Sequence, residues 1–430
     1  MPLAYAAGSW TVPSHAALFT GLLPRAAGLP RAPEGTPASC RPRLLSLRDR
    51  LLPEVLRRAG YETRALSTNA WLLPESGFDT GFERFELIDP SRDLDFGSPG
   101  HRHAARALVE ALQARVDDGA EEARERLRAW TGEKRDRPFF WFVNLVEAHS
   151  PYLPPKPYNP LGPRSRMRAA SEARRYLSLN SVWQASLGLL DVPPEVIERM
   201  RALYAAAIRQ LDAWVGDTLE ALDKAGALDD TLVILTADHG ENLGESGMLG
   251  HSFSLDERLL RVPLVTAGPV DLADDELLSL ASVPNRLGAS LELSSHPWDD
   301  PLDEGVAVAQ FDPPTGPDDP RNQVALNRWG VEDPDGDIVR SFTSKLTCAT
   351  DGRTKLLARD ETLELIDLHV DPLEEHSRLV ESAPPDIEHL ARALAEAENA
   401  PVTSDDALSP AEPTDEIEDL EKRMRLLGYL

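Results

Sequence analysis

The sequence contains few cysteines and no long apolar run. Its two cysteines, Cys40 and Cys348, lie far apart and form no Cys-x-x-Cys pair. This spacing excludes a disulfide scaffold and a zinc–thiolate site, although it is compatible with a single bridge. No segment approaches the roughly 20 consecutive apolar residues of a membrane span. The first residues, MPLAYAAGSW, also lack the charged start and longer apolar run of a secretory signal. We therefore expect a cytoplasmic protein.

Lysine is also scarce, and acidic residues are in large excess. Only six of the 45 basic residues are lysines, whereas Asp and Glu number 72, and the net charge is −27. A surface of this sign repels a phosphate backbone, so the composition argues against a nucleic-acid-binding protein. With 36 prolines, the carboxylate excess predicts a halophilic protein, because concentrated salt screens the repulsion among its carboxylates. A GC-rich genome would explain the scarcity of lysine but not the acidity.

Strand-like and helical patterns alternate along the first 323 residues. A chain of 430 residues with 42% apolar side chains is large enough for a sizeable core. Unbroken apolar runs predict buried strands, and longer stretches with one apolar face predict helices. The predicted strands are 61–66, 139–146, 231–237, 261–268 and 306–311, and the predicted helices include 46–60, 103–130 and 198–225. Because such alternation is typical of a parallel sheet, we expect an α/β fold with helices on both faces.

The pattern changes after Gln323 to short alternating strands, SKLTCAT, TKLLA and LELID, which end at Asp367. They predict a small antiparallel subdomain, followed by a helix over 385–398. The acidic stretch 399–415 has the composition of a linker, and a last helix is expected to dock or to cap the fold. The sequence therefore predicts a catalytic domain over 1–323, a subdomain over 324–398, and a linker with a terminal helix over 399–430.

Polar side chains follow several of the predicted strands. In open parallel sheets, functional groups collect in the loops that leave the carboxyl ends of the strands. The residues in such loops are Asn69, Glu147, His149, Asp238, His239, Glu241 and His251.

The tripeptide Asp238-His239-Gly240 is the sharpest of these patterns. One carboxylate oxygen and one imidazole nitrogen suit a divalent cation, and the glycine allows the backbone to turn there. The alternative for the tripeptide is an ordinary turn. His149 and His251, taken singly, are equally compatible with loop histidines that only satisfy local hydrogen bonds.

The segment SWTVPSHAALFTG places Thr11 just before a predicted helix that starts near Pro13 and Ser14. Backbone N–H groups at a helix start bind anions. The alternative is an ordinary capped helix, and composition does not choose between the two.

These motifs resemble those of the sulfatases, which belong to the alkaline phosphatase superfamily. The sulfatase nucleophile motif is Cys or Ser, any residue, then Pro-Ser-Arg, ending in Leu-(Leu/Phe)-Thr-Gly. In TVPSHAALFTG, Thr11 takes the nucleophile position, Pro13 and Ser14 are in register, and His15 stands where sulfatases carry arginine. The resemblance continues through GYETRALSTN, GFDTGFERFE, EAHSPYLPP, LDDTLVILTADHGENLGE, GHSFSLDERLLRVPLV and ELIDLHVDPLEEH, and so covers about residues 4–395.

The resemblance implies an alkaline-phosphatase-like fold and an ester hydrolase. It implies that Thr11 is the nucleophile and a metal ligand, and that Asp238 and His239 are metal ligands. His149 and His251 would face the ester and its leaving group, and Asn69 and His15 would bind the substrate. It also implies one divalent metal ion, which is calcium or, as in some relatives, manganese or zinc.

Two departures from the family pattern affect these expectations. Sulfatases oxidise their Cys or Ser to formylglycine, and threonine is not a substrate for that conversion. Threonine nucleophiles are typical of phosphodiesterase, phosphatase and phosphotransferase relatives. The family also begins with a buried strand that ends in metal-binding aspartates, whereas this chain starts at AYAAGSWT just before Thr11. We therefore expect this strand to be missing and the 430-residue form to be weakly active or insoluble.

The sequence thus predicts a metal-dependent hydrolase of sulfate or phosphate esters that acts on a small molecule or a glycan. Two alternatives remain, namely a transferase of phospho-alcohol groups to glycans and a non-catalytic binding protein with the same fold. Metal content would separate the second alternative from an enzyme. The sequence says nothing about oligomeric state.

Overall fold

The computed structural model describes residues 3–88, 117–152, 154–270, 272, 277–298, 302 and 305–403. They form two compact units. Unit 1 comprises the described parts of 3–59, 232–242 and 251–403, and unit 2 comprises those of 60–231 and 243–250. Unit 1 is therefore assembled from segments that are distant in the sequence.

Unit 1 contains the first helix and the C-terminal strands. Its helices are α1 (Thr11–Thr20), α2 (Arg41–Ser46), α3 (Leu52–Arg58), α9 (Glu257–Leu260), α10 (Val283–Ser290), α11 (Pro320–Trp329), α12 (Asp337–Thr343) and α13 (Glu388–Asn399). Its 3-10 turns are Pro37–Cys40, Arg48–Arg50, Leu280–Ser282 and Pro385–Ile387. Its strands are β1 (Leu3–Tyr5), β5 (Val233–Thr236), β8 (Arg261–Val262), β9 (Leu264–Ala267), β10 (Leu277–Ser279), β11 (Ala307–Phe311), β12 (Leu346–Thr350), β13 (Thr354–Arg359), β14 (Thr362–Asp367) and β15 (Arg378–Val380).

Helix α1 is buried along almost its whole length. It begins after Trp10, whose backbone is extended, and it ends at Gly21, whose φ of 67° is left-handed. The N–H of Gly21 donates to the carbonyl of Ala17, which closes the last turn. Strand β1 precedes α1 and lies between β10, to which it is parallel, and β8, to which it is antiparallel. The chain thus delivers Thr11 from a strand directly into the start of a helix.

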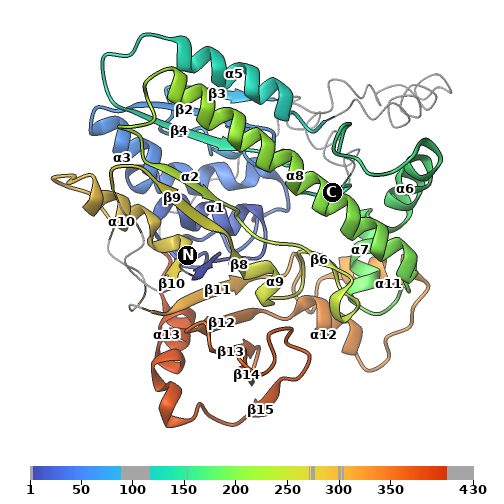
Figure 1. Ribbon diagram of the computed structural model, residues 1–430. Coiled ribbons are helices and arrows are strands. Elements are labelled where there is room, and N and C mark those ends of the chain that lie inside the picture. Colours follow the sequence, from blue (N-terminus) through green and yellow to red (C-terminus); the bar gives the residue numbers. More distant parts are fainter. Residues whose placement is uncertain are drawn as a thin grey trace. The chain divides into compact units, whose positions relative to one another are not determined.

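A five-stranded antiparallel sheet forms the C-terminal part of unit 1, in the order β11-β12-β13-β14-β15. The predicted strands at 346–350, 354–359 and 362–367 and the helix over 385–398 are confirmed. Helix α13 packs against this sheet, where Leu390 and Leu394 join Leu356 in one buried cluster (Figure 1).

Two strands that were expected in the parallel sheet are placed differently. Residues 306–311 supply β11, which pairs antiparallel with β12 in the C-terminal sheet. Within 261–268, β9 pairs antiparallel with β5. Apolar runs predict burial equally well for either strand direction, so the sequence pattern could not separate the two arrangements.

Unit 2 is built around a parallel sheet in the order β3-β2-β4. Its strands are β2 (Glu62–Ser67), β3 (Arg84–Leu87), β4 (Phe139–Asn144) and β7 (Leu249–Gly250). Its helices are α5 (Ala120–Gly132), α6 (Pro163–Tyr176), α7 (Leu179–Ser186) and α8 (Pro194–Lys224). Its 3-10 turns are Pro74–Ser76 and Glu245–Gly247. Strand β6 (Asn242–Leu243) lies at the boundary of the two units.

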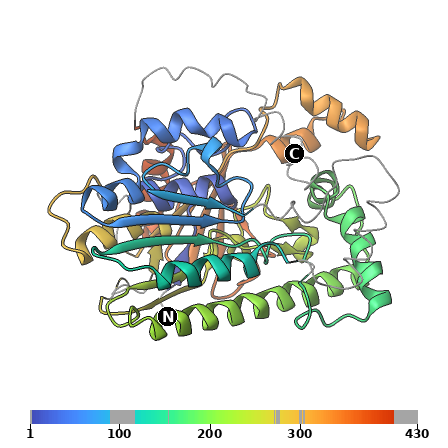
Figure 2. The same cartoon turned by 90° about the horizontal axis from the view of Figure 1, so that it is seen from above.

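Helices α5 and α8 pack together beside this sheet (Figures 1 and 2). Trp130 of α5 and Trp214 of α8 share a buried cluster with Leu66 of β2. The predicted helices over 46–60 and 198–225 are confirmed by α3 and α8, whereas α5 corresponds to only the second half of the helix predicted over 103–130. Residues 103–116 and the terminal helix of the sequence prediction lie outside the described residues. None of the helices in the described ranges is long and apolar enough to cross a membrane.

Candidate active site

Unit 1 brings together four of the residues that the sequence singles out, from α1 and from the turn after β5. Ser14 of α1 donates its hydroxyl to the carbonyl of Asp238 at 2.5 Å. His15 of α1 places Nδ1 2.9 Å from the Thr11 carbonyl oxygen and 3.4 Å from Oδ2 of Asp238. Thr11 and Asp238 therefore both lie within reach of the same imidazole nitrogen.

Thr11 is the first residue of α1 and is almost fully buried. The first amides of a helix have no intrahelical acceptor. In α1, Pro13 has no amide hydrogen, and the amide of Ser14 donates to the Trp10 carbonyl. The helix therefore leaves the amides of Thr11 and Val12 as N-terminal donors beside the Thr11 side chain, an arrangement that suits an oxyanion.

His15 stands where the sulfatase motif has arginine, and it is turned inward. Its side chain is almost fully buried, and its ring meets Phe19 edge-on at 6.2 Å between centroids. Because a backbone carbonyl can only accept, Nδ1 of His15 carries the proton that it shares with the Thr11 carbonyl. The same nitrogen lies 3.4 Å from Oδ2 of Asp238, so His15 connects the start of α1 to the turn after β5.

Asp238 and His239 present two acceptor atoms to each other. Nδ1 of His239 lies 2.8 Å from the Gly240 carbonyl oxygen, so Nδ1 is protonated and Nε2 carries a lone pair. That Nε2 atom lies 3.5 Å from Oδ2 of Asp238. Oδ2 is buried and accepts no hydrogen bond from any residue in the described part of the chain. Two facing lone pairs repel each other unless a proton or a cation neutralises them.

The pKa values of this pair favour the forms that bind a cation. Burial opposes ionisation of Asp238, but the imidazoles of His239 and His15 outweigh it and hold the pKa of Asp238 below its ordinary value. Burial lowers the pKa of His239, and the attraction of Asp238 only partly compensates. A carboxylate next to a neutral imidazole is therefore the favoured state.

Gly240 has to be glycine for this turn to exist. A Cβ atom at this position would lie 1.9 Å from the carbonyl oxygen of Arg258, which is far inside van der Waals contact. The amide of Gly240 donates to the carbonyl of Leu259 at 2.8 Å. The turn after β5, which contains Asp238 and His239, is therefore packed directly against the backbone of α9.

His251 forms a pair with Glu241. Its Nδ1 atom lies 2.8 Å from Oε1 of Glu241, and the two imidazoles of His239 and His251 are 4.5 Å apart between centroids. Burial would lower the pKa of His251, but the charge and the hydrogen bond of Glu241 raise it above its ordinary value. The sequence places Glu241 in this loop but assigns it no role. Its position two residues after His239 was the only local feature that pointed to a role in the site.

Asn69 and His149 belong to unit 2, where they follow the neighbouring parallel strands β2 and β4. The loops after these strands are joined, since the amide of Val146 donates to the hydroxyl of Thr68 at 3.0 Å. Oδ1 of Asn69 accepts the amide of Trp71, and Nδ1 of His149 lies 2.9 Å from the Ser150 carbonyl oxygen. The two loops therefore share one edge of this sheet, as the sequence predicts.

Glu147 precedes His149 and is also buried. Its Oε1 atom accepts the amide of Ala120 at the start of α5, whereas Oε2 has no hydrogen-bond partner among the described residues. Burial, together with the nearby carboxylates of Asp118 and Asp117, raises the pKa of Glu147 to about 8. Glu147 thus anchors α5 in a largely protonated state.

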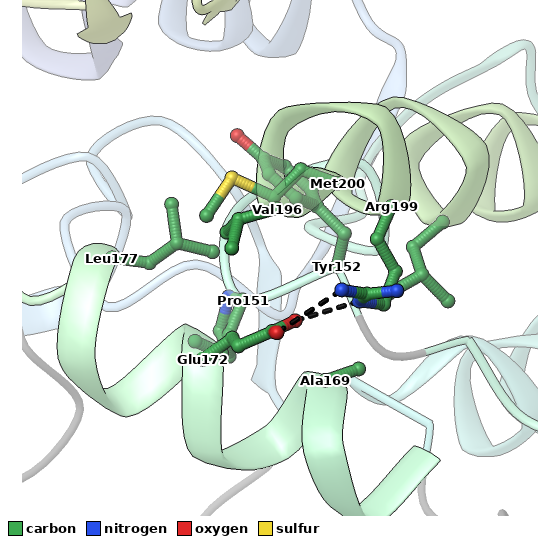
Figure 3. Close-up of a pocket in the computed structure, with 10 residues that line it drawn as sticks. Pro151, Tyr152, Ala169, Glu172, Leu177, Val196, Arg199 and Met200 are labelled. Carbon is green, nitrogen blue, oxygen red and sulfur yellow. Dashed lines mark hydrogen bonds and ion pairs between the residues drawn. The ribbon is translucent and has the colours of Figure 1, made fainter. Parts of the chain in front are cut away.

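A small pocket lies beside the loop after His149 (Figure 3). Pro151 and Tyr152 of this loop line it together with α6 and α8, and an ion pair between Glu172 and Arg199 crosses its floor. Its empty space of about 260 Å³, part of which is open to solvent, is smaller than typical ligand pockets of about 300–1,000 Å³. Its charges are already paired, so we assign no substrate to it.

The residues around Asp238 suit a divalent cation as part of a ligand set. Asp238 offers a buried, unpaired carboxylate oxygen, and His239 offers the lone pair of Nε2. Among the described residues, however, no group of three or more His, Cys, Asp or Glu side chains could hold a metal ion. The described residues thus supply two candidate ligands, Asp238 and His239.

Comparison with known proteins agrees with the fold and with these motifs. Residues 2–284 match the family model for Sulfatase. A curated relative, the choline-sulfatase of Rhizobium meliloti (strain 1021), is 28% identical over 361 residues, which cover 74% of this chain and 65% of the relative. The chain thus spans less than two thirds of the length of that relative.

Two solved structures share the fold. The phosphonate monoester hydrolase of Agrobacterium radiobacter aligns with a TM-score of 0.56 at 19% identity, over 98% of this chain and 88% of the other. A second structure, BT4656 in complex with its substrate D-glucosamine-2-N,6-O-disulfate, aligns with a TM-score of 0.58 at 14% identity, over 95% of this chain and 92% of the other. These similarities confirm the expected α/β fold of the alkaline phosphatase type. Since the family model matches well over half of the residues, the chain belongs to the sulfatase family.

Proposed function

We propose that the protein hydrolyses sulfate or phosphate esters, with phosphorus esters preferred, and that Thr11 is its nucleophile. The observation that carries the proposal is the cluster in unit 1 in which His15 contacts both Thr11 and Asp238 beside His239. Family membership and the similarity to a phosphonate monoester hydrolase support the general class of reaction.

In the first step, the hydroxyl oxygen of Thr11 attacks the phosphorus or sulfur atom, and the bond to the alcohol oxygen breaks. The hydroxyl proton passes to solvent, and His251 gives a proton to the departing alcohol. In the second step, a water oxygen attacks the same atom, Thr11 leaves with a proton from that water, and His251 regains its proton from solvent. The sum is ester plus water giving alcohol plus the free oxyanion.

Asp238 and His239 are the residues that would hold a divalent ion, with the hydroxyl of Thr11 as a third ligand. Sulfatase-family relatives generally depend on such an ion. When bound, a divalent ion lowers the pKa of a hydroxyl and neutralises charge on the ester. The imidazole of His239 suits manganese or zinc better than calcium, which prefers oxygen ligands.

His251 has the features of a general acid. The hydrogen bond from Nδ1 to Glu241 fixes the orientation of the ring, and in this proposal Nε2 carries the transferable proton. In this proposal His15 orients Asp238, and the amides at the start of α1 bind an ester oxygen. For His149 and Asn69 the family motif implies contact with the substrate.

The preference for phosphorus follows from threonine itself. Formylglycine expels sulfate by elimination from an aldehyde hydrate, which threonine cannot form. A threonyl ester has to be hydrolysed by water instead. The alcohol part of the ester can be a small molecule or a glycan. Both are compatible with the relatives described above, one of which is named for choline sulfate.

The proposal is tested by turnover of four substrates by the full chain, namely an aryl sulfate, a phosphate monoester, a phosphodiester and a phosphonate monoester. Each is measured with calcium, manganese and zinc in high salt. Turnover of phosphorus esters that Thr11→Ala abolishes supports the proposal. A chain that binds no stoichiometric metal and turns over none of the four would instead be a non-catalytic binding protein. Transfer to an added glycan without release of the free oxyanion would identify a transferase.

A further inference from the structure

A buried ion network connects the C-terminal sheet of unit 1 to helix α9. Lys355 of β13 is fully buried. Its Nζ atom lies 3.0 Å from the carbonyl oxygen of Leu255, 2.6 Å from Oε1 of Glu374 and 2.8 Å from Oε1 of Glu257. The ammonium group donates hydrogen bonds to Leu255 and Glu374, and it forms an ion pair with Glu257, whose Oε1 atom accepts no hydrogen bond from the described residues.

The remaining carboxylate oxygens of the network are also used. Oε2 of Glu374 accepts the backbone amide of Glu257 at 2.9 Å, and Oε2 of Glu257 accepts the hydroxyl of Tyr5 at 2.8 Å. Burial would lower the pKa of Lys355, but the two carboxylates raise it above its ordinary value, so the amine stays charged. A buried ion network contributes little to net stability, because desolvation offsets much of the attraction. A buried network of ion pairs and hydrogen bonds can nevertheless fix the positions of the segments that it joins.

This network reaches each of the three segments that carry the candidate active-site residues of unit 1. Tyr5 ends strand β1, and the chain then runs through Gly8 into Thr11. Leu255 and Glu257 lie just after His251 in the chain. Helix α9, which begins at Glu257, accepts the amide of Gly240 at Leu259 and abuts Gly240 at Arg258.

We propose that Lys355 is a positioning residue that sets the relative placement of Thr11, the Asp238-His239 turn and His251. It acts through α9 and β1 and is not a catalytic residue. The proposal rests on the proposed function for its effect on turnover, whereas its structural core can be tested without any substrate.

The substrate-free test is amide hydrogen exchange of the full-length protein. Lys355→Met replaces the amine by an apolar side chain of similar length. We expect faster exchange at the amides of Glu257 and Gly240, because their acceptors lie on Glu374 and on α9. Lys345→Met in the same sheet region is the control, since the side chain of Lys345 is 67% exposed and its ion pair with Asp312 is 4.0 Å long. Equal exchange in the two variants would overturn the proposal.

The second test separates positioning from stability. Lys355→Met leaves two carboxylates without a counter-ion, and adding Glu374→Gln removes one of them. We expect the double variant to recover thermal stability while kcat for the best ester substrate stays about 10²-fold below that of the wild type, with a much smaller change in KM. Recovery of kcat in step with stability would show a merely structural role and would overturn the proposal.

Two further outcomes remain decisive. If Lys355→Met does not fold, Glu374→Gln alone takes its place, because its amide puts an NH2 donor where one of the two carboxylate oxygens now accepts the Lys355 amine or the Glu257 amide. If the wild type turns over no ester, the proposed function fails, and hydrogen exchange alone decides whether Lys355 holds the three segments together.

Discussion

Glu241 and His251, ten residues apart in the chain, form a carboxylate–imidazole pair with 2.8 Å between Oε1 and Nδ1. The carboxylate can only accept, so it holds the proton on Nδ1 and fixes the plane of the ring. Nε2 is the ring nitrogen that does not face Glu241. The pair therefore defines where a leaving group would receive its proton.

The first prediction concerns this pair. Glu241→Gln removes the charge that orients His251, so we expect turnover of alkyl esters to fall by about 10²-fold. Nitrophenyl esters should lose much less, because their leaving group needs no proton. The measurement is kcat/KM for both classes, with the exposed Glu388→Gln as a control. Equal losses for both classes would contradict the role of His251 as a general acid.

The second prediction concerns the nucleophile. Thr11→Ala removes the attacking oxygen, and we expect at least about a 10³-fold loss of turnover on every substrate. Thr11→Ser keeps a hydroxyl at the start of α1 and should retain measurable activity. Both are compared on a phosphonate monoester and an aryl sulfate. Robust aryl-sulfate hydrolysis that depends on Thr11, without activity toward phosphorus esters, would contradict the expected preference.

The third prediction concerns metal binding. We expect the wild type to bind one divalent ion per chain in calorimetric titrations with manganese, zinc and calcium. Asp238→Asn keeps the shape of the side chain but loses its charge. Loss of a partner that only orients a metal ligand can already weaken metal binding by about tenfold, so loss of the ligand charge itself should weaken it by more than that. The exposed Asp223→Asn serves as a control. An unchanged affinity in Asp238→Asn would remove Asp238 from the ligand set.

The fourth prediction concerns the pH dependence of stability through Glu147. Its folded pKa is about 8, whereas an unfolded Glu has a pKa of about 4.3. Between these values the folded state binds the extra proton, so the free energy of unfolding should fall as pH rises from about 5 to 8, and above 8 the full loss should remain. Glu147→Gln stays neutral and can still accept the Ala120 amide, so it should flatten this dependence.

Denaturant unfolding at pH 6 and pH 8.5 measures the effect of Glu147. We expect Glu147→Gln to be more stable than the wild type at pH 8.5 by at least about 1.4 kcal/mol, the equivalent of one pKa unit. Glu198→Gln, at an exposed position of α8, should leave the profile unchanged. Identical profiles for the wild type and Glu147→Gln would show that Glu147 ionises normally in the folded state.

The fifth prediction concerns salt. With a net charge of −27, the folded state repels itself in dilute buffer, and concentrated potassium chloride should raise the midpoint of thermal unfolding. The measurement compares midpoints in the two solutions at the same pH. Equal midpoints would refute the halophilic interpretation.

The sequence predicted local elements well, because their signals are local. Strands β12, β13 and β14 and helix α13 follow short periodic patterns, and Gly21 marks the end of α1. The partner of β11 was not predictable, because its alternatives differ only in contacts with residues far away in the chain. A buried apolar run looks the same in either sheet.

The candidate site shows the same division. Motif spacing singled out Thr11, Asp238, His239 and His251. In unit 1, Thr11 and Asp238 both contact His15, and His239 contacts Asp238. The inward orientation of His15 depends on a carbonyl one helical turn away and on a carboxylate more than 200 residues later. The role of Lys355 depends entirely on such distant contacts, so no pattern within the sequence could have indicated it.

The geometry around Lys355 also bears on the composition of the chain. Arginine supplies most of the positive charge, yet a guanidinium would suit this position poorly, because its five donors lie in one plane and the site offers three separate acceptors around a compact point. Sites of this kind set a lower limit on how far a genome can exchange lysine for arginine. In strongly acidic proteins of similar composition, the few remaining lysines would then be the first residues to test for buried ion pairs that join separate segments of the chain.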